Sequence, residues 1–212
     1  MNLFIDIAFL RGCGNELIVK ELAFVQLRKS RSVTQSYVFK YPYFHGYLST
    51  SVKRTNSWCA ENLNNLRWCD GTVNYSELNN IFSDAVKWYA PRQKGINGQR
   101  VIFAKGSEKC TFLRRLVKVN RLSNTIVKDL DEYKCPKADS LYFENLTGEN
   151  PFDLFASLEC GFAHEGKECA LNKAAKYNVW YETEVRSKCN TSSRNSSICC
   201  IINSNRRKSS GR

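Results

Sequence analysis

The sequence predicts an α/β fold in which helices flank a mixed five-stranded sheet. Three observations lead to this prediction. Three strand-like segments follow one another at the start of the chain, strand-like and helix-like patterns then alternate, and 212 residues are enough for one domain with a substantial core. Consecutive strands favour an antiparallel start, whereas the later alternation favours a parallel βαβ finish, with helices over the faces of the sheet.

The first three strands are expected in residues 2–10, 16–27 and 30–44. The first segment, NLFIDIAFL, is apolar and β-branched, and the RGCGN that follows it holds two glycines suited to a tight turn. The second, ELIVKELAFVQL, is a nearly continuous apolar run that contains Lys20 and Glu21. The third alternates, is rich in aromatic residues and ends at Pro42. Together they predict an antiparallel meander.

Helical spacing begins after these strands. Apolar residues at helix-like intervals predict a helix within 51–66 and a clearer one over 74–90, with Asn74 as its N-cap and Glu77 at the capping-box position. The remaining elements alternate. They are a strand in 99–106, a helix in 107–117 capped by Ser107, a strand in 123–133, a short helix opened by Cys135–Pro136, and a final helix in 168–185.

Composition changes after the final helix. Residues 187–212 are rich in Ser, Asn and Arg and low in complexity, which predicts a disordered tail behind a single domain in 1–186. The tail carries six of the 32 basic residues and no acidic one, so 26 basic residues face 20 acidic ones in the domain. An excess of positive charge in both the domain and the tail favours binding to a polyanion such as nucleic acid. The alternative is that the excess charge serves only solubility.

The sequence also indicates a compartment. No apolar run approaches the roughly 20 residues of a membrane helix. The hydrophobic start of the chain does not resemble a signal peptide, because Asp6 interrupts it and no basic segment precedes it. The four N-x-S/T sequons could indicate a secreted, glycosylated protein, but such short motifs are common enough to occur by chance. The ten cysteines are therefore expected in a reducing, intracellular compartment, cytoplasmic or nuclear, with no membrane partner.

Four side chains suggest a structural zinc ion. Cys160, His164 and Cys169 lie within ten residues, and Cys135 could supply a fourth ligand. Three thiolates and one imidazole make a closed tetrahedral zinc site. The alternatives to zinc binding are that these residues cluster by chance, or that the cysteines serve redox chemistry or form disulfides.

Three stretches resemble the DEDD 3′–5′ exonuclease branch of the ribonuclease H-like proteins: FIDIAF, LIVKELAFVQL and HEGKECAL. The resemblance covers roughly residues 2–182 and implies a ribonuclease H-like fold in which four carboxylates hold two divalent cations. Asp6 matches that pattern, but Ala8, Lys109 and Cys169 stand where the family has acids. Nuclease chemistry with Mg²⁺ or Mn²⁺ would have to use Asp6 with Glu21 and Glu108. These departures predict a catalytically degenerate domain.

The C-terminal Cys/His arrangement resembles the maelstrom domain of germline piRNA-pathway proteins. It is also similar to a group of uncharacterised arthropod and transposon-associated proteins. In the maelstrom domain a zinc site has replaced the catalytic acids, and the resemblance implies the same role for Cys135, Cys160, His164 and Cys169.

The sequence therefore favours a zinc-stabilised, catalytically degenerate domain that binds nucleic acid, with single-stranded RNA as the expected ligand. An active single-strand nuclease, with or without a metal, and a protein-interaction scaffold are the alternatives. Tyr41, Tyr43, Phe44 and Tyr47 form a lysine-flanked cluster that could stack on unpaired bases. The expected phosphate-binding residues are Lys20, Lys53, Arg54, Arg114, Arg115 and Lys118 in the domain, and Arg206, Arg207 and Lys208 in the tail.

Overall fold

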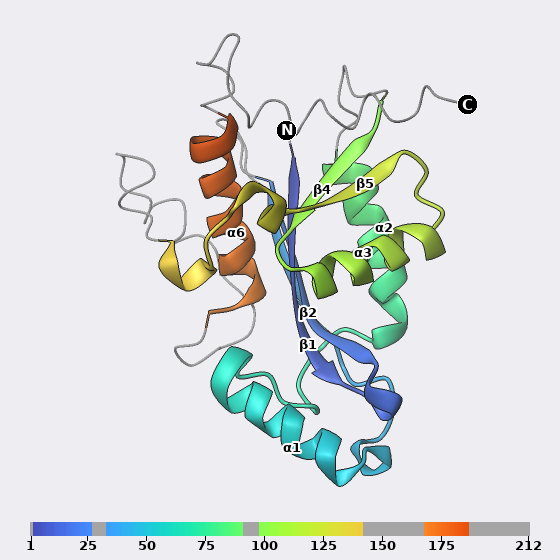
Figure 1. Ribbon diagram of the computed structural model, residues 1–212. Helices are drawn as coiled ribbons and strands as arrows, with labels where there is room; N and C mark the ends of the chain where they lie inside the picture. Colours follow the sequence, from blue (N-terminus) through green and yellow to red (C-terminus); the bar gives the residue numbers. More distant parts are fainter. Residues whose placement is uncertain (1, 27–32, 91–97, 142–167, 187–212) are drawn as a thin grey trace, which may run out of the picture.

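A single mixed sheet forms the centre of the computed structural model, which describes residues 2–26, 33–90, 98–141 and 168–186 (Figure 1). Its strands lie in the order β3-β2-β1-β4-β5. Their bounds are β1 Leu3–Arg11, β2 Leu17–Gln26, β3 Val33–Val38, β4 Arg100–Ala104 and β5 Thr125–Asp129. β2 runs antiparallel to both of its neighbours, whereas β1, β4 and β5 are parallel. The expected α/β class, antiparallel start and parallel finish are confirmed.

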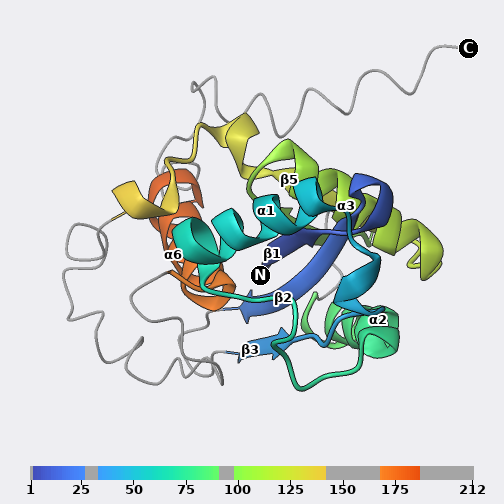
Figure 2. The ribbon, with the colours of Figure 1, turned by 90° about the horizontal axis from the view of Figure 1, so that it is seen from below.

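Helices lie on both faces of this sheet and at one end of it. They are α1 Thr50–Cys59, α2 Leu78–Tyr89, α3 Ser107–Val119 and α6 Ala170–Trp180. α2 and α3 cover one face, α6 covers the other, and α1 lies across the end at which β1 finishes (Figures 1 and 2). The final helix continues past α6 as a wider turn over Tyr181–Arg186.

The two faces of the sheet are packed differently. The face under α2 and α3 has large aliphatic and aromatic side chains in contact, among them Ile5, Leu22 and Phe24 of the sheet and Phe82 and Leu113 of the helices. Small residues join α6 to β2, because Ala174 and Ala175 pack against Ala23 and Val25. Farther along α6 an aromatic group closes the layer, with the rings of Phe4 and Phe103 stacked at 5.1 Å and Tyr181 against both.

Three predicted helix starts differ from those in the structure. Gly106, rather than Ser107, is the N-cap of α3, and its φ of 98° explains why glycine stands there. Asn74 precedes a short 3-10 turn that leads into α2, and its side chain caps neither element. The helix expected from Pro136 is a single 3-10 turn, Ala138–Ser140. The tail 187–212 lies outside the described residues.

A β-bulge in the central hairpin turns Lys20 into the interior. Ala8 pairs with Glu21 and Phe9 with Val19, so Lys20 is the extra residue of β2. Its side chain is fully buried, and its ammonium donates to three backbone carbonyls: Phe39 O at 2.6 Å, Trp68 O at 3.0 Å and Asp70 O at 2.7 Å. The expectation that Lys20 contacts nucleic acid is wrong, because the group is enclosed and its donors are engaged.

Replacing Lys20 with methionine should destabilise the fold by at least about 2 kcal/mol, because three inward-facing carbonyls lose their donor. Burial lowers the pKa of Lys20 to about 8, with the nearby Asp70 acting in the opposite direction. Between pH 8 and the ordinary value of 10.5 the unfolded chain therefore binds more protons than the native one, so the Lys20 contribution to stability rises with pH. Urea unfolding of the parent and Lys20→Met at pH 7 and pH 10 measures both effects.

Lys40→Met provides the control, because Lys40 is exposed and its replacement should change stability by about 0.5 kcal/mol or less. Equal stability of Lys20→Met and the parent at both pH values would show that the three carbonyls do not depend on the ammonium.

Candidate metal and nucleic-acid sites

Asp6, the one carboxylate that matches the nuclease pattern, is neutralised from within the chain. It lies midway along β1 and is 1% exposed. Lys109, in the first turn of α3, donates from Nζ to Asp6 Oδ1 at 2.5 Å. Lys109 precedes the buried Cys110, which packs in the core and so fixes the start of the helix. Lys109 thus places a positive charge against the buried Asp6 carboxylate.

Glu21 is buried at the start of α6. Ser36 Oγ donates to its Oε1 at 2.9 Å, and the backbone N–H of Ala170 donates to its Oε2 at 3.0 Å. The positive end of the helix dipole further favours a carboxylate at this point. Cys169 is the N-cap of α6, where its Sγ accepts from Asn172 N at 3.4 Å. The structure therefore places Glu21 next to Cys169, a neighbourhood that neither the spacing of the cysteines nor the strand pattern indicates.

Glu108 belongs to neither of these groups. Its side chain is 56% exposed and forms an ion pair of 3.0 Å with Arg11 at the end of β1. Asp6, Glu21 and Glu108 thus have three different partners. Among the described residues, no group of three or more His, Cys, Asp or Glu side chains is arranged to hold a metal ion.

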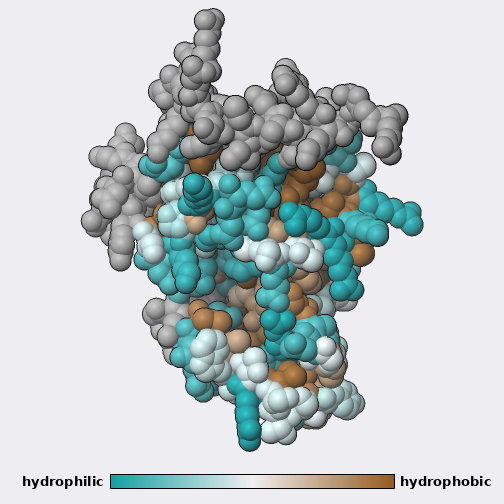
Figure 3. All heavy atoms as spheres, viewed as in Figure 1, coloured by the Kyte–Doolittle hydropathy of each residue, from teal (hydrophilic) through white to brown (hydrophobic). Residues whose placement is uncertain are grey.

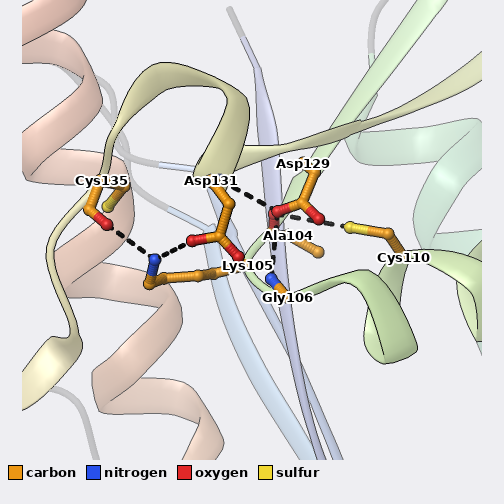
Figure 4. A network of polar contacts seen from close by, with 7 residues as sticks. All are labelled: Ala104, Lys105, Gly106, Cys110, Asp129, Asp131 and Cys135. Carbon is orange, nitrogen blue, oxygen red and sulfur yellow. Dashed lines mark hydrogen bonds and ion pairs between the residues drawn. The ribbon is translucent and has the colours of Figure 1, made fainter.

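A further polar network, which the sequence analysis missed, closes the carboxyl ends of β4 and β5 (Figure 4). Asp129 accepts from Gly106 N at 3.1 Å and from Asp131 N at 3.0 Å. Lys105 forms an ion pair with Asp131 and donates to Cys135 O at 2.7 Å. In open α/β sheets this edge is where ligands commonly bind. Here its charged side chains join β5 to the start of α3 and to the chain near Cys135. Asp129, an aspartate at the end of a short strand, is the one sequence signal for it.

The expected zinc ligands are only partly described. Cys160 and His164 lie outside the described residues. Cys135 packs in the aromatic group with Phe4 and Phe103, where burial raises its pKa to about 12, whereas Cys169 packs against Ala23 and Val25. The two thiols thus belong to separate clusters. The carboxylate of Glu21 lies near Cys169, because its Oε2 accepts from the backbone N–H of the next residue, Ala170, at 3.0 Å.

The remaining basic residues are divided between α1, α3 and the tail. Arg114, Arg115 and Lys118 are exposed on α3, and Arg114 also donates to Val127 O at 3.2 Å. Arg54 is exposed on α1, and Lys53 is partly exposed and lies 3.5 Å from Gly46 O. Arg206, Arg207 and Lys208 lie outside the described residues.

No family model matches the chain, and no curated protein matches it. In the parts of the chain that the structure describes, every helix is too short or too polar to cross a membrane.

Removing either member of the Asp6–Lys109 pair should cost more than removing both. Lys109→Met leaves a buried carboxylate without its cation and should destabilise the fold by about 3 kcal/mol at neutral pH. Adding Asp6→Asn to it should restore at least about 1 kcal/mol, because the uncompensated charge is gone. Chemical denaturation of the parent, both single variants and the double variant gives the coupling energy.

Lys118→Met, an exposed position on the same helix, should stay within about 0.5 kcal/mol of the parent. Additive effects of Asp6→Asn and Lys109→Met would mean that the two groups do not interact.

Proposed function

We propose that this chain is a catalytically inactive, ribonuclease H-like domain that binds nucleic acid, preferably single-stranded RNA. The strand order supports the fold assignment: an antiparallel β3-β2-β1 meander continues into the parallel β4 and β5, which is similar to the ribonuclease H-like arrangement. The sequence resemblance in β1, β2 and the last helix follows the same order.

The Asp6–Lys109 ion pair carries the proposal of inactivity. Two-metal nucleases hold their cations about 3.5–4 Å apart with several carboxylates. Here a lysine ammonium lies against the one matching acid, Arg11 engages Glu108, and Ser36 and the start of α6 engage Glu21. A divalent cation at Asp6 would have to displace the ammonium, and among the described residues no group of three or more potential ligands is arranged to hold it.

Charge and exposure support nucleic acid as the ligand. The chain has a formal charge of +12, and several of its cations, such as Arg11, Lys105 and Lys109, are used in internal ion pairs. Arg114, Arg115 and Lys118 differ, because these exposed groups form no ion pair within the described residues. They follow one another along one helix, so they present positive charge to solvent along α3.

Neutralising this α3 group should weaken RNA binding and its salt dependence together. For single strands the slope of log K against log salt changes by about 0.7 for each phosphate contact, so replacing Arg114, Arg115 and Lys118 with glutamine should lower the slope by about 2. Fluorescence anisotropy with a labelled single-stranded RNA over a salt series measures affinity and slope.

The matched control removes the same charge elsewhere, by replacing Lys87, Lys137 and Arg186 with glutamine. Lys87 and Arg186 already face Asp84 and Glu182, so a smaller change in slope is expected. An affinity of the parent that does not change with salt would refute the binding proposal. In the same tubes the RNA should stay intact with Mg²⁺, Mn²⁺ or chelator; cleavage that Asp6→Asn abolishes would establish the nuclease alternative.

Structural zinc is the second part of the proposal. Cys160, His164 and Cys169 would supply three ligands and hold the start of α6, and the fourth would come from Cys135 or Glu21. We favour Glu21 as the fourth ligand, because it lies next to Cys169, whereas Cys135 packs in a separate cluster. A zinc ion there would add a cross-link between β2 and α6, which the Glu21–Ala170 hydrogen bond also joins at this point.

Metal analysis of protein purified without added zinc should give about one zinc per chain. His164→Ala and Cys169→Ala should lose it, Glu21→Gln should reduce it, and Cys135→Ala should retain it. Loss of zinc in Cys135→Ala with retention in Glu21→Gln would restore Cys135 as the fourth ligand, and a parent protein without zinc would refute the site.

A further inference from the structure

Three large aromatic side chains project into solvent just before and beside the start of α1. Tyr41 is 43% exposed, Phe44 is 65% exposed and Tyr47 is 74% exposed. We call these three residues, with the neighbouring Lys40, Lys53 and Arg54, the aromatic tip. It belongs to the end of the molecule that α1 forms (Figure 1), where hydrophobic, intermediate and hydrophilic side chains lie side by side on the surface (Figure 3).

The backbone that carries these rings is held firmly. Tyr43, between them, packs its ring against Trp68 with centroids 5.4 Å apart, and its hydroxyl accepts from Cys13 N at 2.6 Å and donates to Glu16 Oε1 at 2.7 Å. Trp68 Nε1 in turn donates to Tyr43 O at 3.2 Å. Leu48 is buried directly after the exposed Tyr47. The chain therefore holds the partly buried Tyr43 and the buried Leu48 as anchors and presents Phe44 and Tyr47 outward.

α1 is fixed to the same end of the sheet. Asn56 bonds the backbone of Arg11 in both directions, with Arg11 N donating to Oδ1 at 2.7 Å and Nδ2 donating to Arg11 O at 2.8 Å. Ser49 caps the helix through Val52 N. These contacts keep Lys53 and Arg54 close to the turn His45–Tyr47, because Lys53 Nζ reaches Gly46 O at 3.5 Å.

The charge of this segment selects the kind of partner. Residues 40–60 contain Lys40, Lys53 and Arg54 and no aspartate or glutamate. The nearby Glu16 accepts a hydrogen bond from Tyr43. Exposed rings among unopposed cations are the combination by which proteins bind unpaired nucleotides, with bases on the rings and phosphates on the cations. A duplex offers no free base faces, so the same rings cannot stack on it.

We propose that the aromatic tip binds single-stranded nucleic acid, with Phe44 and Tyr47 stacking on unpaired bases and Lys40, Lys53 and Arg54 contacting phosphates. This inference rests on the proposed nucleic-acid function and locates its single-strand preference. The rings of Phe44 and Tyr47 meet edge to face, with centroids 6.0 Å apart and planes at 85°. Each ring therefore offers its own face, so two bases would stack on separate rings at different angles rather than lie parallel to each other between them.

The test compares Phe44→Ala/Tyr47→Ala with the parent, using labelled single-stranded oligouridine and an RNA duplex of equal length. Loss of one stacked base lowers affinity about fivefold or more, so the double variant should bind the single strand at least about 25-fold more weakly. Its salt slope should be unchanged because no phosphate contact is lost. Affinity for the duplex should be unchanged. Phe44→Trp/Tyr47→Trp should keep single-strand affinity.

Trp88→Ala is the matched control, because Trp88 is 79% exposed at the other end of the molecule. Tyr75, before α2, bonds Val19 near the start of β2, and Tyr89 bonds Gln26 at its end, so the last turn of α2 lies far from the aromatic tip. This variant should bind like the parent.

The outcomes separate the two proposals. A parent that binds RNA in a salt-dependent way, with Phe44→Ala/Tyr47→Ala equal to Trp88→Ala, would overturn the aromatic tip and leave the nucleic-acid function standing. A parent that binds no RNA would remove the proposed function and this inference together. Equal losses for single strand and duplex would show that the rings do not stack on bases.

Discussion

A charged ammonium inside the protein determines how two distant parts of the backbone, at Phe39 and at Trp68–Asp70, meet. Burying a charge is strongly unfavourable unless every donor finds an acceptor, so the carbonyls of Phe39, Trp68 and Asp70 must converge on Lys20. That requirement sets the path of the chain after β3 and of the loop before α2. Through Trp68 it also reaches Tyr43 and hence the exposed rings. The bulge in β2 is the feature that directs Lys20 to this place.

The same principle operates in the middle of the sheet, where charges that could serve chemistry serve structure instead. Asp6 and Lys109 compensate each other, and Glu21 satisfies the start of α6 and Ser36. Each of these carboxylates accepts from donors that the chain itself provides, and those donors come from other elements of the fold. The acids therefore link β1 to α3 and β2 to β3 and α6.

Much of the fold could be predicted from the sequence, since the apolar runs of β1 and β2 are long and α2 is clearly amphipathic. The sites were harder to predict. Lys20 and Glu21 are adjacent in an apolar run, and periodicity does not show that a bulge sends them to different partners. Asp6 and Lys109 are 103 residues apart, and Glu21 and Ala170 are 149 apart, so only the folded chain brings them together. The spacing of Cys135 and Cys169 likewise did not reveal their separate packing.

The packing of α6 has a consequence for how the chain is made. β1 and β2 emerge from the ribosome long before α6, yet Ala23, Val25 and Phe4 are covered by this helix, which begins at Ala170. During synthesis this apolar face therefore stays open to water and to other nascent chains until α6 has been translated. Such a late closing element leaves apolar surface exposed on the growing polypeptide for longer than in a domain whose neighbours in sequence are also neighbours in the core.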